Sequence, residues 1–125
     1  MNFNNYTIKS QEAVQQAQQI AQSLGHQQIE NEHVFKGISN VDENVLPYLL
    51  KKLNVNQQLL NQVIESTLQS FPKVEGGELQ LSRTANTTLL EANNLAKKME
   101  DEYVSVEHLL PVSYTHLTLP TTPYV

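Results

Sequence analysis

The sequence predicts an all-α fold made of two pseudo-repeats of a small helical bundle, the second of them incomplete. Apolar residues recur at spacings of three and four along most of the chain, which is the period of a helix with one buried face. No stretch before residue 110 alternates between apolar and polar residues as a half-buried strand would. The chain also matches itself when it is shifted by 75 positions.

The first pseudo-repeat, residues 1–71, opens with a helix that we expect from Ile8 to Leu24. Thr7 stands where a hydroxyl N-cap is preferred, and Gly25 stands where a left-handed residue ends a helix. The inner side of this helix carries Ala13, Val14, Ala17, Ile20, Ala21 and Leu24.

Three shorter helices are expected in the same repeat, at residues 31–38, 43–53 and 57–70. The middle one contains Pro47, which a helix tolerates only in its first turn. The segment Asn54-Val55-Asn56 then supplies a turn and a cap. The apolar positions of the last two helices again follow the helical period, at Val45, Leu46, Leu49, Leu50, Leu53, Leu59, Leu60, Val63, Ile64 and Leu68.

Residues 72–81 are interpreted as a linker, because a proline followed by two adjacent glycines interrupts regular structure. Beyond the linker, Ser82 is the expected cap of a second long helix that reaches Met99. Ser105 is the expected cap of a short helix that starts at Val106.

The internal match relates the two halves residue by residue. A shift of 75 positions aligns Glu32-His33 with Glu107-His108, and it pairs core-type residues of the same class: Val14 with Leu89, Ala17 with Ala92, Ile20 with Leu95, Ala21 with Ala96, Leu24 with Met99 and Ile29 with Val104. The second pseudo-repeat, residues 82–110, therefore begins like the first and lacks the helices that follow it there.

Residues 111–125 differ from the rest of the chain. They contain no Asp, Glu, Lys or Arg and are rich in Thr and Pro, and Pro111 stands where a helix should continue. A proline inside a helix costs about 3 kcal/mol. We interpret this tail as non-native, from a frameshift or cloning scar, or else as a natural disordered tail, and exclude it from the predicted fold.

Composition excludes several classes of function. The chain has no cysteine, so disulfides and Cys-based zinc sites are excluded. A net charge of −5 argues against a nucleic-acid partner, which requires a basic face. No apolar run approaches the roughly 20 residues that span a bilayer, so no membrane partner is expected. The start of the chain lacks the pattern of a secretory signal, and we expect a cytoplasmic protein.

Three motifs together carry a family resemblance: FNNYT at residues 3–7, PKVEGG at 72–77 and DEYVSVEHLL at 101–110. With the internal repeat, they resemble the Clp amino-terminal domain, and in particular that of ClpB-type disaggregase chaperones. The resemblance extends over residues 1–110.

The resemblance implies a non-catalytic domain that engages unfolded or aggregated protein and is attached to a hexameric AAA+ chaperone. The substrate-binding positions it implies are Thr7, Asp101 and Glu107, with apolar groove walls around Leu89 and Leu95 in a shallow groove between the pseudo-repeats. It implies no cofactor in this chain. ATP would be bound by modules outside it, and the chain contains no P-loop motif.

Two alternatives remain open. The fold is shared by adaptor- or degron-binding domains of Clp protease ATPase subunits. A different class, a small metal-dependent enzyme, would use the two Glu-His pairs, Glu32-His33 and Glu107-His108. Neither pair has the spacing that places two histidines on one helical face, so we interpret them as first-turn residues of short helices and expect no catalytic or metal site.

Overall fold

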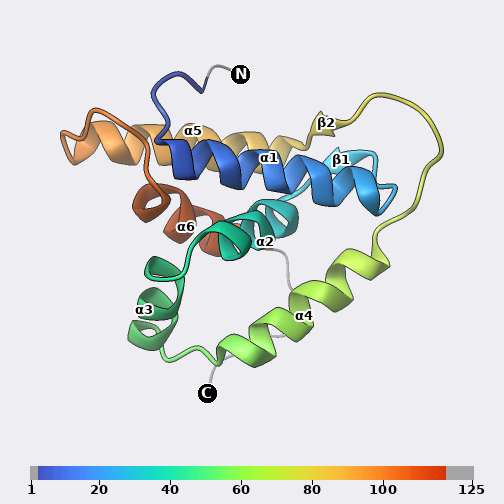
Figure 1. Ribbon diagram of the computed structural model, residues 1–125, viewed down its shortest axis with the longest axis horizontal. Helices are drawn as coiled ribbons and strands as arrows, with labels where there is room; N and C mark the ends of the chain where they lie inside the picture. Colours follow the sequence, from blue (N-terminus) through green and yellow to red (C-terminus); the bar gives the residue numbers. More distant parts are fainter. Residues whose placement is uncertain (1–2, 118–125) are drawn as a thin grey trace.

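The computed structural model describes residues 3–117 and confirms the all-α class (Figure 1). In chain order its elements are α1 (Ile8–Ser23), β1 (Gln28–Ile29), α2 (Asn31–Val41), α3 (Val45–Lys52), α4 (Gln57–Ser70), β2 (Gln80–Leu81), α5 (Arg83–Lys98) and α6 (Val106–Thr115). Within residues 3–117, no helix combines the length and the apolar character needed to cross a bilayer.

The helices begin at the caps that the sequence predicts. The Thr7 hydroxyl accepts a hydrogen bond from the Ser10 N–H, and the Ser82 hydroxyl accepts one from the Ala85 N–H. Asn56 caps α4 by accepting from the Leu59 N–H at 3.0 Å. Pro47 lies in the first turn of α3, where its missing N–H leaves no helical hydrogen bond unmade. Side-chain caps therefore fix where the chain enters these helices.

Each repeat forms a helical pair, α1 on α2 and α5 on α6, and the two pairs pack together through α2 and α6. The α1–α2 contact is close because small residues meet there. Ala13, Ala17 and Ala21 on α1 are fully buried, and Gly37 on α2 has no room for a Cβ atom beside the Ala13 carbonyl. Helix α4 packs on α2 of its own repeat, whereas α3 packs on α6 of the other repeat (Figure 1).

Two short parallel pairings cross between the repeats. β1 pairs with β2, with Ile29 opposite Leu81, and Tyr6 forms an isolated parallel bridge with Val104. The two pairings are equivalent under the 75-residue shift, because 6 and 104 in one correspond to 81 and 29 in the other. The segment that leads into the first long helix of each repeat is therefore bound to the turn of the opposite repeat.

Helix α6 does not stop at Leu110, where we expected the folded part of the second repeat to end. It continues through Pro111 to Thr115, and the side chains of Val112, Tyr114 and Leu117 pack against the core. Burial of these apolar groups offsets the cost of the proline. The origin of the tail stays a prediction, and residues 118–125 lie outside the described part of the chain.

Replacing Pro111 by Ala should stabilise the domain. The new N–H can bond to the Glu107 carbonyl one turn earlier, so we expect the free energy of unfolding to rise by up to about 3 kcal/mol. Urea unfolding followed by circular dichroism measures this change. Pro47→Ala is the matched control, because that proline lies in a first turn and its replacement should change stability little. An equal effect of both substitutions would contradict a helix that runs through Pro111.

Candidate functional site

Thr7, Asp101 and Glu107 lie at one end of the molecule, where α1 begins beside the α5–α6 turn (Figure 1). Backbone hydrogen bonds hold this arrangement. The Thr7 N–H donates to the Val104 carbonyl at 3.0 Å, and the Val104 N–H donates to the Asn5 carbonyl at 2.7 Å. Val104 lies between Asp101 and Glu107 in sequence, so this pairing brings the amino-terminal segment to the two acidic residues.

Asp101 is fixed by a histidine. The Ser105 N–H donates to His108 Nδ1 at 2.9 Å, so in the neutral ring the proton is on Nε2, which donates to Asp101 Oδ2 at 2.7 Å. The His108 side chain is buried, whereas that of Asp101 is 47% exposed. The Asp101 carboxylate is therefore oriented by the buried histidine on one side and open to solvent on the other.

Glu107 differs from Asp101 because its carboxylate forms no hydrogen bond or ion pair within residues 3–117. Its backbone N–H donates to the Ser105 hydroxyl, which places Glu107 in the first turn of α6. A carboxylate there is favoured by the positive end of the helix dipole. Glu107 is thus an exposed anion that is available to a ligand.

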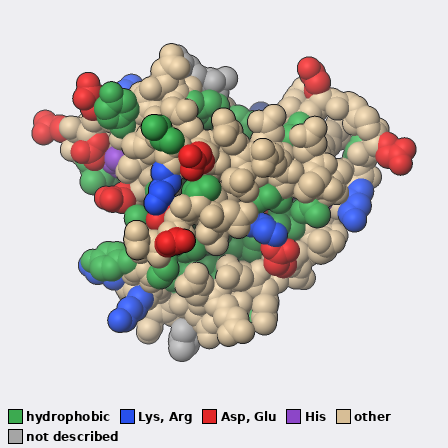
Figure 2. Space-filling model, in the orientation of Figure 1, with side chains coloured by type: hydrophobic (Ala, Val, Ile, Leu, Met, Phe, Trp, Pro, Cys, Tyr) green, Lys and Arg blue, Asp and Glu red, His purple; other side chains and the backbone are tan. Residues whose placement is uncertain are grey.

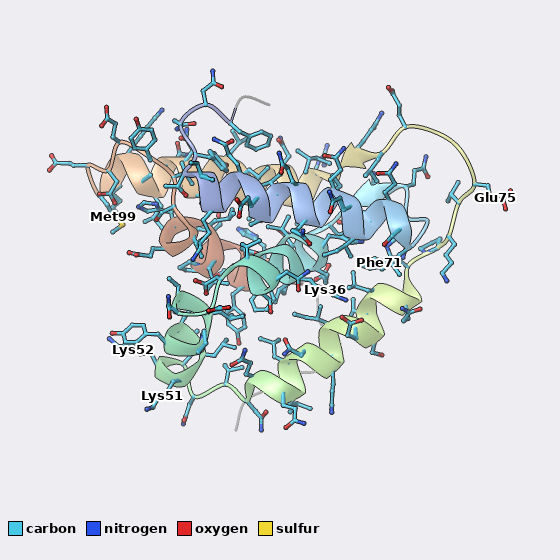
Figure 3. The ribbon with its side chains drawn as sticks, viewed as in Figure 1. Lys36, Lys51, Lys52, Phe71, Glu75 and Met99 are labelled. Atoms are coloured by element: carbon cyan, nitrogen blue, oxygen red, sulfur yellow. The ribbon has the colours of Figure 1, made fainter. Side chains whose placement is uncertain are left out.

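Exposed apolar side chains surround these three residues. Ile8 is 76% exposed, Met99 56% and Tyr103 52%. Figure 2 shows acidic side chains gathered with apolar ones at this end, and Figure 3 shows Met99 at the end of α5. A surface that mixes apolar side chains with carboxylates can bind apolar segments that also carry positive charge.

The predicted groove walls occupy different environments. Leu89 is 1% exposed and belongs to the core, where its carbonyl accepts a hydrogen bond from the Tyr6 hydroxyl. Its side chain cannot form a groove wall in this structure. Leu95, further along α5, is half-buried.

The apolar hollow that Glu107 borders lies elsewhere, between α3 and α6. It has a volume of about 510 Å³ and is lined by Asn44, Val45, Tyr48, Leu49, Glu107 and Pro111. Sequence reasoning missed the α3 residues, although a signal was present. That signal is Tyr48, an aromatic side chain outside the apolar set at Val45, Leu46, Leu49 and Leu50, and it is 61% exposed.

The first repeat contains the counterpart of the His108 arrangement with a different partner. The Glu30 N–H donates to His33 Nδ1 at 2.8 Å, and His33 Nε2 then donates to His26 Nδ1 at 2.8 Å. His26 and Asp101 are equivalent under the 75-residue shift. Phe71, at the junction of α4 and the linker, packs against both histidine rings (Figure 3).

Burial keeps this histidine pair neutral. It lowers the pKa of His33 to about 4, with further lowering by the positive charges of His26 and Lys36. Burial also lowers the pKa of His26, as does the charge of Lys73, and the Leu68 carbonyl partly opposes this. The pair is therefore a stabilising contact of the neutral form only.

The two Glu-His pairs belong to separate elements of the fold. They lie in different helices, Glu32-His33 in α2 and Glu107-His108 in α6. Among residues 3–117, no group of three or more His, Asp or Glu side chains is placed to hold an ion. Both pairs are first-turn residues, as the spacing indicated.

The fold and this surface define a helical double-repeat domain whose repeats are joined by reciprocal strand pairing. The family model of the Clp repeat (R) N-terminal domain matches residues 5–112. The chain belongs to the Clp N-terminal repeat domain family.

Two of the relatives it matches are chaperones. The chain is 49% identical over 110 residues to the chaperone protein ClpB of Bacteroides thetaiotaomicron and 39% identical over 110 residues to that of Porphyromonas gingivalis. In each case the match covers 88% of this chain and 13% of the relative, so the chain spans about an eighth of their length.

Solved structures share the fold. The N-terminal domain of the ClpV1 ATPase from E. coli matches this chain with a TM-score of 0.82. The match covers 94% of this chain and 74% of the ClpV1 chain. The Hsp104 N-terminal domain from Candida albicans matches with a TM-score of 0.79, and the match covers 88% of this chain and 73% of the Hsp104 chain. Both are 19% identical to this chain, so they bear on the fold alone.

Acid should weaken the first repeat through His33. Its folded pKa of about 4 lies below the usual 6.5, so the unfolded chain binds a proton first as the pH falls. The stability that the folded state gains from neutral His33 is fully present above pH 6.5 and is lost as the pH falls from 6.5 to about 4. The loss in the free energy of unfolding is up to about 3 kcal/mol. Urea unfolding at several pH values between 7.5 and 4 measures it.

The substitution His26→Asp isolates this effect, since it copies the Asp101–His108 arrangement into the first repeat. A carboxylate beside His33 should raise the pKa of that histidine and flatten the loss of stability between pH 6.5 and 4. Gln27→Asp adds the same charge at the adjacent exposed position and is the control. Equal pH slopes in both variants would show that the histidine pair does not set the acid sensitivity.

Proposed function

We propose that this chain is the non-catalytic, substrate-engaging amino-terminal domain of an ATP-dependent protein disaggregase of the ClpB type. Its membership of the Clp family and its identity to ClpB chaperones support this. In this proposal the parent is a hexameric AAA+ chaperone of the cytoplasm, and ATP is bound outside this chain, which itself uses no cofactor.

The proposed activity is weak binding of unfolded or aggregated polypeptide at the surface of Thr7, Asp101 and Glu107. The observation that carries it is the Thr7–Val104 backbone pairing, because it assembles two carboxylates and exposed apolar side chains from opposite ends of the chain on one surface. Leu95 flanks this surface in the proposal, and Leu89 supports it from the core. Such a surface favours apolar segments that carry Lys or Arg.

An unfolded basic polypeptide tests the proposal directly. Labelled lysozyme that has been reduced and carboxamidomethylated should bind the domain in a fluorescence anisotropy titration. The double variant Asp101→Asn, Glu107→Gln removes both charges and keeps the size of the side chains, so binding should weaken about fivefold or more and lose most of its salt dependence. The amide oxygen introduced at position 101 can still accept the hydrogen bond from His108.

The control is Glu75→Gln with Glu78→Gln, which removes two exposed charges from the linker. Full binding by the Asp101/Glu107 variant would refute the assignment of these residues. Absence of any binding to the unfolded polypeptide, together with binding to a folded adaptor protein, would favour the adaptor-binding domain of a Clp protease ATPase instead.

A further inference from the structure

We infer that the hollow between α3 and α6 binds one large apolar side chain of an extended polypeptide. A Lys or Arg close to that side chain in the bound segment would then meet Glu107 on the α6 side of the hollow. This inference rests on the proposed function and names the kind of segment that is bound. It adds Tyr48 and its neighbours on α3 to a surface that the sequence placed entirely on α1, α5 and α6.

The walls of the hollow are suited to an apolar anchor. The α3 wall consists mainly of Val45, Tyr48 and Leu49, and Pro111 lies on the α6 wall. The Tyr48 side chain is 61% exposed although it is aromatic, and its ring forms part of the hollow. A volume of about 510 Å³ is in the range of sites that bind small ligands, so the hollow has room for one large apolar side chain of a bound segment.

Among the described residues that line the hollow, only Glu107 is charged. Glu107 stands on the α6 wall, and its carboxylate has no ion-pair partner within residues 3–117. Lys52 Nζ lies 5.2 Å from the centre of the Tyr48 ring, but Lys52 does not line the hollow and lies on the outer side of α3 (Figure 3). A bound cation is therefore attracted to the α6 wall, where Glu107 stands.

This charge pattern selects one occupant. In an extended segment, side chains two residues apart point the same way and are separated by about 7 Å. An apolar side chain can fill the hollow while a Lys or Arg two residues away reaches Glu107. An acidic residue at the same place would be repelled by the Glu107 carboxylate.

Two synthetic peptides provide the probes. The first is capped Gly-Ser-Phe-Ala-Arg-Ser-Gly, and the second has Glu in place of Arg. Titrated into the full ¹⁵N-labelled chain, the first should shift the amide signals of Val45, Tyr48, Leu49 and Glu107. The second should bind about tenfold more weakly, because its charge is repelled.

Variants separate the anchor from the charge. Tyr48→Ala should weaken both peptides about tenfold, and Glu107→Gln should bring their affinities close together. Leu59→Ala, which truncates an exposed apolar side chain on α4, is the matched control and should change neither. Thermal unfolding of each variant shows whether it is folded.

Three results would overturn the inference. Peptide shifts confined to the Thr7 and Asp101 region, or unchanged affinity of Tyr48→Ala, would remove the anchor site. Shifts at Tyr48 on concentrating the chain without peptide would assign the hollow to a second copy. If the unfolded lysozyme binds while Tyr48→Ala has no effect, the anchor site fails and the proposed function stands. If neither peptide nor lysozyme binds, both fail.

Discussion

The reciprocal strand pairing between the repeats is the constraint on which the remaining structure depends. Each long helix starts directly after a segment that is bound to the turn of the other repeat, at Tyr6–Val104 and at Leu81–Ile29. The caps Thr7 and Ser82 follow these pairings immediately, and each donates its backbone N–H across to the other repeat at 3.0 Å. The entry into each long helix is therefore held by a backbone hydrogen bond to the other repeat. The same pairing places Thr7 beside the α5–α6 turn and so creates the candidate surface.

The two repeats share one histidine hydrogen-bond arrangement but place it in different surroundings. His33 and His108 each accept a backbone N–H at Nδ1, which fixes Nε2 as the donor in both neutral rings. In the first repeat that proton goes to buried His26, and Phe71 covers the pair. In the second repeat it goes to an exposed carboxylate, Asp101. The buried pair closes the junction with the linker, whereas the exposed one leaves an oriented negative charge on the surface.

The sequence predicted the helices well because their signals are local. Spacings of three and four and the hydroxyl or amide caps at Thr7, Asn56, Ser82 and Ser105 each act within one or two turns. The two-residue strands were not predicted, since so short a pairing has no period. The crossing of α3 to the opposite repeat was not predicted either, because it depends on how two helical pairs pack. The continuation of α6 through Pro111 depends on burial of Val112 and Tyr114, which outweighed the local penalty that the prediction relied on.

The candidate site combines what was predictable with what was not. Thr7, Asp101 and Glu107 could be placed by resemblance, and the repeat explains why they meet. The equivalent residue of Glu107 in the first repeat is Glu32, which is buried. One repeat thus encloses this carboxylate and the other exposes it, although both stand in the first turn of a short helix. Glu107 also borders the hollow whose other wall is α3, the helix that packs on the opposite repeat. In the proposed function, the polypeptide therefore binds where the two repeats differ, at the exposed Glu107 of the second repeat.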